Sequence, residues 1–415
     1  MKRRKTIFMI ILLILTGVYL FLRLNDFEIK ANYFFDQGLH LLESFQMVSD
    51  KKIRLIGPMA TSKTFLDRGF FIGPQYYYVL GILGIITKWN PMAIDLILLF
   101  IELGFILYFV NWIRKKYGGI EALSIFGLIT FSRYFIIHSR FFWNPHFLIP
   151  LGVLMVIILD KYIKTNKIKY LLGVGLMWGL AFGFHYASVF WTIPLLIILV
   201  KNKKLWNKNT FIYLPIGFIL GDLPWFVFEI RNNFYNINTI VWVMSQSSSN
   251  EHFELYYLIH PLGIFIFWGL AWLLNIIKNK KIFFGIVLVL GISLLQVKFI
   301  TNPSPLIHPT DWNYPTQKIV VEKILKNGCP DKFNVASTLS GDTRSYDLRF
   351  LLTIKGCEPM GVEDYPNAEK LFLIAPIDRP PETETVWEVS SFREFKVNRQ
   401  EKLTEKIVFW ELIKK

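Results

Sequence analysis

Cysteine is scarce in this sequence, with only Cys329 and Cys357 among 415 residues. Both follow the last long apolar segment, and neither has other metal-ligating residues at zinc-site spacing. This scarcity excludes a disulfide-dense scaffold and a cysteine-based zinc site. If the region faces an oxidising compartment, the two cysteines are expected either to form a disulfide or to remain as free thiols.

Several nucleotide and metal motifs are also missing. The sequence contains no G-x-x-x-x-G-K-[ST] phosphate loop, no G-x-G-x-x-G dinucleotide motif and no H-E-x-x-H zinc motif. Acidic residues are fewer than basic ones, 31 against 46, which gives a net charge of +15. The cations stand at the ends of apolar segments rather than on one face, so they indicate membrane orientation signals and argue against nucleic-acid binding.

Apolar residues are abundant: 53% of the chain is hydrophobic and 17% is aromatic. They fall into repeated segments of roughly 20 residues, the length that crosses a hydrocarbon core. The sequence therefore predicts a polytopic α-helical membrane protein. The apolar segments are 6–23, 74–88, 92–113, 119–137, 146–163, 168–186, 187–200, 210–228, 256–277 and 281–299.

Five basic clusters predict the topology of these segments, because loops rich in Lys and Arg stay in the cytoplasm. The clusters are Lys2–Lys5, Arg114–Lys116, Lys161–Lys169, Lys201–Lys208 and Lys278–Lys281. Three apolar segments lie between the first two clusters, so an even number of crossings requires that one of them does not cross. We expect this segment to be 74–88, because it is the shortest of the three and begins with the interfacial residues Pro74-Gln75-Tyr76-Tyr77-Tyr78. We therefore expect about nine crossings, a cytoplasmic N-terminus and juxtamembrane helices in a long outer loop at 24–91. No small-residue cleavage site follows segment 6–23, so we expect an uncleaved helix rather than a signal peptide.

The predicted domains are a transmembrane catalytic domain at 1–300 and a small extracytoplasmic α/β domain at 301–415. A Pro-rich linker leads into this second part, followed by a helical stretch at Thr316–Lys326 and by short β-like runs at Phe333–Ala336, Leu371–Ile374 and Lys406–Leu412. The same topology places Asp36, Arg140, His185, Glu229 and Arg231 on the outer side.

Asp36 is the candidate catalytic base in the long outer loop. It follows Tyr33-Phe34-Phe35, and bulky neighbours at the membrane surface favour a desolvated, more basic carboxylate. The ordinary alternative is a solvated surface acid, which holds for most exposed carboxylates. Four further ionisable residues stand near helix ends: Arg133, Arg140, His185 and Asp222. For each of them, structural pairing or snorkelling is the alternative to a functional role.

Five motifs occur in order over residues 34–236. They are Asp36-Gln37-Gly38; Ile56-Gly57-Pro58 with Thr61-Ser62; Gly73-Pro74-Gln75-Tyr76-Tyr77-Tyr78; Ser139-Arg140-Phe141-Phe142-Trp143-Asn144-Pro145-His146 with Phe184-His185-Tyr186; and Pro224 through Phe228-Glu229-Ile230-Arg231 to Asn236. This order resembles the GT-C membrane glycosyltransferases of the protein O-mannosyltransferase type, glycosyltransferase family 39, which includes aminoarabinose transferases.

The resemblance implies a polyprenyl-phosphate sugar donor and a lipid, glycan or protein acceptor at the outer face of the cell membrane. Asp36 would be the catalytic base for inverting transfer of a hexose or pentose, and the basic groups would stabilise the leaving phosphate. The substrate-binding candidates are Lys63, Arg68, Tyr77, Arg140, Asn144, His185, Glu229 and Arg231. No metal ligand is assigned, and participation of a divalent cation stays open.

This sequence also departs from the family pattern. Gly38 stands in place of Ala, Leu39 in place of Arg, and His146 in place of the second Asn of its motif. Arg68 or Lys63 is expected to supply the missing cation of the first loop. The alternative functions are a transporter or flippase of lipid-linked sugars, which favours paired repeats and broken helices at mid-membrane, and a non-catalytic scaffold.

Overall fold

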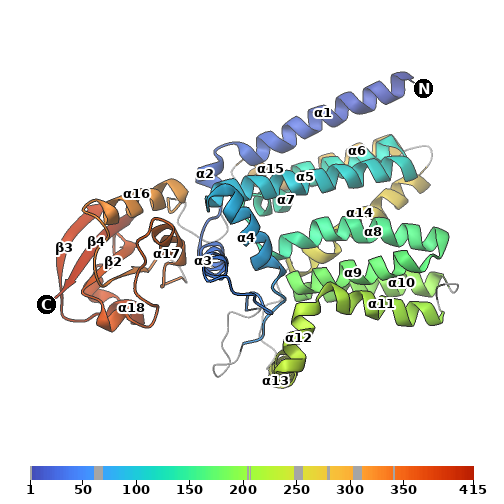
Figure 1. Ribbon diagram of the computed structural model, residues 1–415. Helices are drawn as coiled ribbons and strands as arrows, with labels where there is room; N and C mark the ends of the chain where they lie inside the picture. The colour runs from blue at the N-terminus through green and yellow to red at the C-terminus, as the bar shows by residue number, and fades with distance from the viewer. Residues whose placement is uncertain are drawn as a thin grey trace.

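The computed structural model contains a long helical bundle and a compact C-terminal domain that contains a β-sheet (Figure 1). The N-terminus lies at the end of the bundle far from the C-terminal domain (Figure 1). The structure describes residues 2–59, 69–202, 205, 207–246, 256–277, 281–301, 311–339 and 342–415.

Membrane-length helices form the frame of the bundle. Four helical spans are long and apolar enough to cross a membrane: Lys5–Leu24 in α1 (Lys2–Leu24), α5 (Pro91–Lys116), Asn144–Thr165 around α8 (Leu148–Thr165), and Leu258–Ile276 in α14 (Tyr256–Ile276). A fifth is possible if α11 (Lys208–Gly221) and α12 (Leu223–Arg231), bent by 83° at Asp222, count as one span. The membrane-embedded character is confirmed, whereas the predicted nine crossings stay a prediction.

The bundle also contains further helices. They are α6 (Gly119–Phe131), α7 (Arg133–His138), α9 (Ile168–Phe184), α10 (Thr192–Lys201) and α15 (Lys281–Thr301), with 3-10 turns η1 (Asn144–Phe147) and η2 (Tyr186–Trp191). The ends of α5 illustrate the local signals. Asn90 caps its first turn by accepting from Met92 N and Ala93 N, Pro91 begins the helix, and basic residues end it.

Helices α9 and α11 pack with their backbones in close contact. Gly175 and Gly179 of α9 face Gly217 and Gly221 of α11, and a Cβ on any of the four would collide with a backbone carbonyl of the other helix. Small residues spaced by four allow this approach, which compensates for the weak drive to pair apolar helices in lipid. The glycine contact brings the α11–α12 bend beside the end of α9.

Short helices cover the end of the bundle that faces the C-terminal domain: α2 (Phe27–Lys30), α3 (Phe35–Ser49), α4 (Gln75–Thr87), α12 and α13 (Tyr235–Gln246) (Figure 1). Helix α4 has 13 residues, too few to cross a hydrocarbon core of about 30 Å at 1.5 Å per residue. Helix α3 occupies a stretch that we expected to be largely loop.

The C-terminal domain is a four-stranded mixed sheet with helices. Its elements are α16 (Tyr314–Leu325), β1 (Phe333–Ser337), α17 (Tyr346–Thr353), β2 (Lys370–Pro376), α18 (Trp387–Ser390), β3 (Phe395–Lys402) and β4 (Ile407–Lys414), with η4 (Tyr365–Asn367) and η5 (Pro381–Thr383). The strand order is β1-β2-β4-β3; β1 and β2 are parallel, and β4 is antiparallel to both of its neighbours. Cys329 and Cys357 form a disulfide with Cα atoms 5.4 Å apart.

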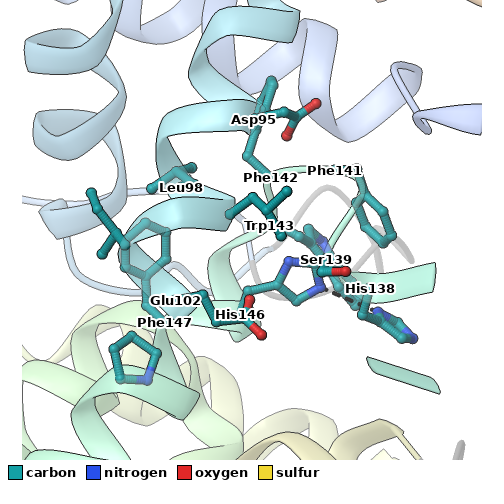
Figure 2. Close-up of a pocket in the computed structure, with 13 residues that line it drawn as sticks. Asp95, Leu98, Glu102, His138, Ser139, Phe141, Phe142, Trp143, His146 and Phe147 are labelled. Carbon is teal, nitrogen blue, oxygen red and sulfur yellow. Dashed lines mark hydrogen bonds between the residues drawn. The ribbon is translucent and has the colours of Figure 1, made fainter. Parts of the chain in front are cut away.

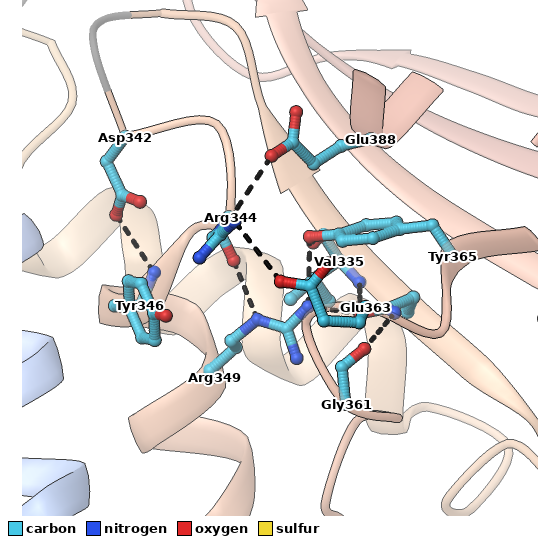
Figure 3. Close-up of polar contacts among 10 residues, drawn as sticks. Val335, Asp342, Arg344, Tyr346, Arg349, Gly361, Glu363, Tyr365 and Glu388 are labelled. Atoms are coloured by element: carbon cyan, nitrogen blue, oxygen red, sulfur yellow. Dashed lines mark hydrogen bonds and ion pairs between the residues drawn. The ribbon is translucent and has the colours of Figure 1, made fainter. Parts of the chain in front are cut away.

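Arg349 fixes the start of α17 within this domain (Figure 3). Its guanidinium donates to the Arg344 carbonyl oxygen at 2.7 Å, to the Met360 carbonyl oxygen at 2.7 Å and to the Tyr365 hydroxyl at 2.9 Å. Charge-assisted bonds of this kind are stronger than neutral ones. They hold the first turn of α17 in position against helix α3.

The C-terminal domain packs directly on α3 through Gly38. A Cβ at this position would lie 2.5 Å from backbone atoms of Tyr346 and Asp347 at the start of α17. The Tyr33 hydroxyl donates to the Asp347 carbonyl oxygen at 3.2 Å, and Gln317 Nε2 donates to the Tyr33 carbonyl oxygen at 2.9 Å. One hydrophobic core contains buried residues of α3, α4 and the C-terminal domain. These two helices and the C-terminal domain therefore pack against each other.

Candidate functional site

Asp36 lies in the first turn of α3 and is half-buried. Its Oδ2 accepts a hydrogen bond of 3.1 Å from the indole Nε1 of Trp143. Two further bonds connect the same segments: Gln37 Nε2 donates to the Phe142 carbonyl oxygen at 3.1 Å, and Asn32 N donates to the Arg140 carbonyl oxygen at 3.3 Å. The structure therefore brings the motif that begins at Asp36 beside the motif that begins at Ser139. Trp143 of the second motif orients the carboxylate of Asp36.

The face of α3 one turn after Asp36 carries His40. Its ring packs edge-on against Tyr76, with centroids 5.2 Å apart, and lies 6.0 Å from the ring of Tyr77. Burial lowers the pKa of His40, and the nearby Asp36 and Glu43 carboxylates act in the opposite direction. Tyr77, a predicted substrate-binding residue, is buried beside this histidine and makes up part of the wall next to Asp36.

The motif around Gln75 contacts Asp222 at the bend between α11 and α12. Gln75 Nε2 donates to Asp222 Oδ1 at 2.7 Å, and Asp222 is fully buried. The neighbouring Phe71 carbonyl oxygen accepts from the Tyr186 hydroxyl at 2.5 Å and from Trp225 Nε1 at 3.0 Å. This motif is therefore held against α9, η2 and α12 by buried polar groups.

Three predicted residues make structural contacts on the surrounding elements. Buried Arg140 donates through Nη2 to the Leu22 carbonyl oxygen at the end of α1. Asn144 Nδ2 donates to the Phe184 carbonyl oxygen at 2.9 Å. His185 is half-buried, and its Nδ1 accepts from Ala187 N at 3.1 Å. These bonds join the motif loop before α8 to α1 and α9; substrate-binding roles for these residues stay predictions.

The other predicted residues lie farther along the chain or outside the described residues. Buried Glu229 accepts from Asn236 N at 3.2 Å, from Asn236 Nδ2 at 2.8 Å and from Ile237 N at 3.1 Å, so its carboxylate caps α13. Arg231, at the end of α12, is exposed. Lys63 and Arg68 lie outside the described residues.

A cavity of about 40 Å³ opens beside Trp143 (Figure 2). Its polar lining comes from Asp95 and Glu102 of α5, His138 at the end of α7, and His146 of η1. Asp95 is 2% exposed, and neither of its carboxylate oxygens makes a hydrogen bond of normal geometry among the described residues. Such a cavity has room for a water molecule or an ion.

Sequence reasoning did not select several residues of this region as functional: Gln75, Asp95, His138, Trp143 and His260, whereas Asp222 was already a candidate as an ionisable group near a helix end. Ionisable groups inside apolar segments provide the signal for Asp95 and Asp222, because burying them is costly without a role. Trp143 stands inside a recognised motif. The proximity of His138 to His260 has no local sequence signal, since 122 residues separate them along the chain.

The arrangement can support proton abstraction at a membrane surface. A half-buried carboxylate is oriented by an indole N–H, and a general base requires such a fixed position. Gln75 begins α4, His185 follows α9 and Arg231 ends α12, so their polar groups come from separate elements.

Comparison with known proteins identifies one family. Residues 73–225 match the family model described as dolichyl-phosphate-mannose-protein mannosyltransferase. No curated protein matches the chain, and no solved structure does. The match covers 153 of the 415 residues and supports the resemblance inferred from the motifs.

Proposed function

We propose, from the match to the dolichyl-phosphate-mannose-protein mannosyltransferase family, that this chain is an inverting glycosyltransferase of the cell membrane. It moves a sugar from a polyprenyl-phosphate donor to a hydroxyl group of a lipid, glycan or protein acceptor. Asp36 is the general base. The observation that carries the proposal is the bond from Trp143 Nε1 to Asp36 Oδ2, because Trp143 belongs to the matched segment and Asp36 precedes it.

In the proposed reaction the acceptor oxygen attacks the anomeric carbon while the bond from that carbon to the phosphate oxygen breaks. Asp36 takes the acceptor proton, and the polyprenyl phosphate leaves with the bonding electron pair. Attack from the side opposite the leaving group inverts the anomeric centre. Groups such as Arg231 and His185 are proposed to face the donor phosphate and sugar, where charge develops.

Two features support an outer-face location for the reaction. The C-terminal domain contains a disulfide between Cys329 and Cys357, and disulfides persist in oxidising, extracytoplasmic environments. The N-terminus, with its basic cluster, lies at the opposite end of the bundle (Figure 1), as expected for a cytoplasmic end.

The test is reconstitution of the full chain in liposomes with a panel of polyprenyl-phosphate sugars, followed by measurement of released polyprenyl phosphate. We expect release with at least one donor. Asp36→Asn should reduce the rate by about 100- to 10,000-fold, the usual contribution of a general base, while donor binding persists.

Asp50→Asn is the matched control, because Asp50 is an exposed carboxylate at the opposite end of the same helix. It should keep the wild-type rate. Full activity of Asp36→Asn would remove Asp36 from the mechanism. Donor translocation without release of carrier would instead establish a flippase.

A further inference from the structure

Three histidines from separate elements meet beside the cavity at Trp143. They are His138 at the end of α7, His146 in η1 and His260 in α14. One nitrogen from each imidazole lies within 4.8 Å of the other two. His138 Nδ1 and His146 Nε2 are 3.2 Å apart (Figure 2). We propose that these three histidines bind a transition-metal ion, Zn²⁺ being the best fit, and the proposal does not depend on the glycosyltransferase activity.

The spacing suits a tetrahedral ion. Zinc–imidazole bonds of about 2.0–2.1 Å at tetrahedral angles separate the ligand nitrogens by roughly 3.3 Å. The pair His138–His146 is at that separation, and the ligand nitrogen of His260 lies within 4.8 Å of both. Nitrogen ligands select Zn²⁺ and its transition-metal neighbours, whereas Mg²⁺ and Ca²⁺ prefer oxygen.

The hydrogen bonds around the imidazole rings of the cluster are those expected of metal-binding histidines. Tyr134 places its hydroxyl 2.5 Å from His260 Nδ1, and the His146 ring is hydrogen-bonded to the backbone of Phe141. Metal-binding histidines characteristically use their second ring nitrogen in this way, which fixes the tautomer and the ring orientation. His138 and His260 are buried, with 7% and 1% of their surfaces exposed.

The cavity provides charge and space for the ion. Asp95 and Glu102 line the same cavity as His138 and His146, and among the described residues the buried Asp95 carboxyl has only the backbone of Phe142 as a hydrogen-bond partner. Ionising such a group costs free energy, and a bound cation would offset that cost. Three protein ligands leave a fourth position, and the cavity of about 40 Å³ can hold a water or an anionic oxygen there.

The site adjoins the proposed catalytic base through one side chain. The Trp143 indole packs with ring centroids 5.8 Å from His146 and 6.1 Å from His260, and its N–H is bonded to Asp36. An ion that orders these rings would therefore also fix the indole. The three histidines would then be positioning residues with respect to Asp36.

The test uses the full chain in detergent micelles, purified without a histidine tag and stripped with a chelator. Zn²⁺ is titrated in competition with a chromophoric chelator, and Co²⁺ is added separately to read coordination from its visible absorption. We expect one ion per chain and a four-coordinate Co²⁺ spectrum. His138→Gln, His146→Gln and His260→Gln should each weaken Zn²⁺ binding by more than about 100-fold, beyond the effect of losing an outer-shell partner.

His185→Gln is the matched control for metal binding, because His185 lies outside the cluster. It should bind Zn²⁺ as the wild type does. Less than one ion per wild-type chain would overturn the proposal, and so would equal affinity in the triple variant or preference for Mg²⁺. The wild-type titration decides the matter even if a histidine variant fails to fold, and a rise in melting temperature with Zn²⁺ supports it independently.

Discussion

At the scale of single residues, a backbone contact in the structure explains why position 38 is Gly rather than the Ala of the family pattern. The family has Ala at this position, whereas here the helix backbone lies directly against Tyr346 and Asp347. A side chain at position 38 would displace α17. Gly38 therefore reflects the docking of the C-terminal domain rather than a change in chemistry beside Asp36.

Gly38→Ala should destabilise the protein. Overpacking at a close contact costs about 1–3 kcal/mol, which exceeds the gain of about 1 kcal/mol from replacing a helical glycine. A lower melting temperature and faster proteolysis between the bundle and the C-terminal domain are expected. Gly104→Ala is the control, because nothing lies within 4 Å of a Cβ there; equal stability of the two variants would contradict the close contact.

Trp143→Phe tests whether the indole N–H positions the Asp36 carboxylate. Removing a hydrogen bond to a charged group costs about 1.5–3 kcal/mol, which predicts a fall in kcat of roughly 10- to 150-fold with little change in KM for the donor. Trp178→Phe is the matched control, because its indole donates to the Ser188 carbonyl oxygen at 3.0 Å. A similar loss of kcat in both variants would indicate a general packing effect.

At the scale of elements, α12 and α13 act together through one carboxylate. Glu229 caps α13 at Asn236 and Ile237, and the Asn236 side chain accepts from Phe71 N at 2.7 Å. Because Asn236 also contacts Phe71, the position of the segment from Phe71 to Gln75 depends on the cap of α13. A substrate-binding role for Glu229 stays a prediction. Its capping bonds could not be predicted from the sequence, because local patterns do not reveal which backbone donors a carboxylate meets.

Glu229→Gln should loosen α13. The amide keeps one acceptor but directs an NH₂ group at a backbone donor, and a lost cap costs about 0.5–2 kcal/mol. Hydrogen exchange in residues 235–242 should become faster without any substrate present. Unchanged exchange combined with weaker donor binding would instead favour direct substrate contact. Arg231→Gln is the control for hydrogen exchange alone, since that side chain is exposed.

The elements of the C-terminal domain and the short helix α4 were largely predictable from sequence, and helix α3 was not. The stretch Thr316–Lys326 and the runs at 333–336, 371–374 and 406–412 correspond to α16, β1, β2 and β4, because each has a clear hydrophobic period. Helix α3 was not predicted. Its buried face packs on residues about three hundred positions later, so no local pattern determines it.

At the scale of the whole molecule, the membrane character and the family were predictable, whereas the assembled site was not. Apolar segments and basic clusters reveal a bundle because lipid imposes length and charge rules on any spanning helix. The bond between Asp36 and Trp143, and the meeting of His138, His146 and His260, come from packing of distant helices. Such proximity requires the three-dimensional fold.

The stability of the whole chain should depend on pH through Asp342. Burial, and then the nearby Asp347 carboxylate, raise the pKa of Asp342 to about 8, against about 3.9 in an unfolded chain. Between these values the native state holds a proton that the unfolded state has released, so stability falls as pH rises through this window.

Asp342→Asn should flatten this dependence between pH 5 and pH 8, because the amide oxygen still accepts from Tyr346 N, as Asp342 Oδ2 does at 2.9 Å. Melting temperatures of the full chain at both pH values measure the effect. Asp378→Asn, at an exposed carboxylate, should leave the slope unchanged. A steeper fall in the Asp342 variant would refute the raised pKa.

The contact between Gly38 and the start of α17 joins the beginning of the polypeptide to its final quarter. A ribosome must therefore synthesise residues beyond 353 before α3 can be seated and Asp36 held in its final surroundings. A prematurely terminated chain would insert its membrane helices yet stay inert. We therefore expect activity only in chains that include the C-terminal domain.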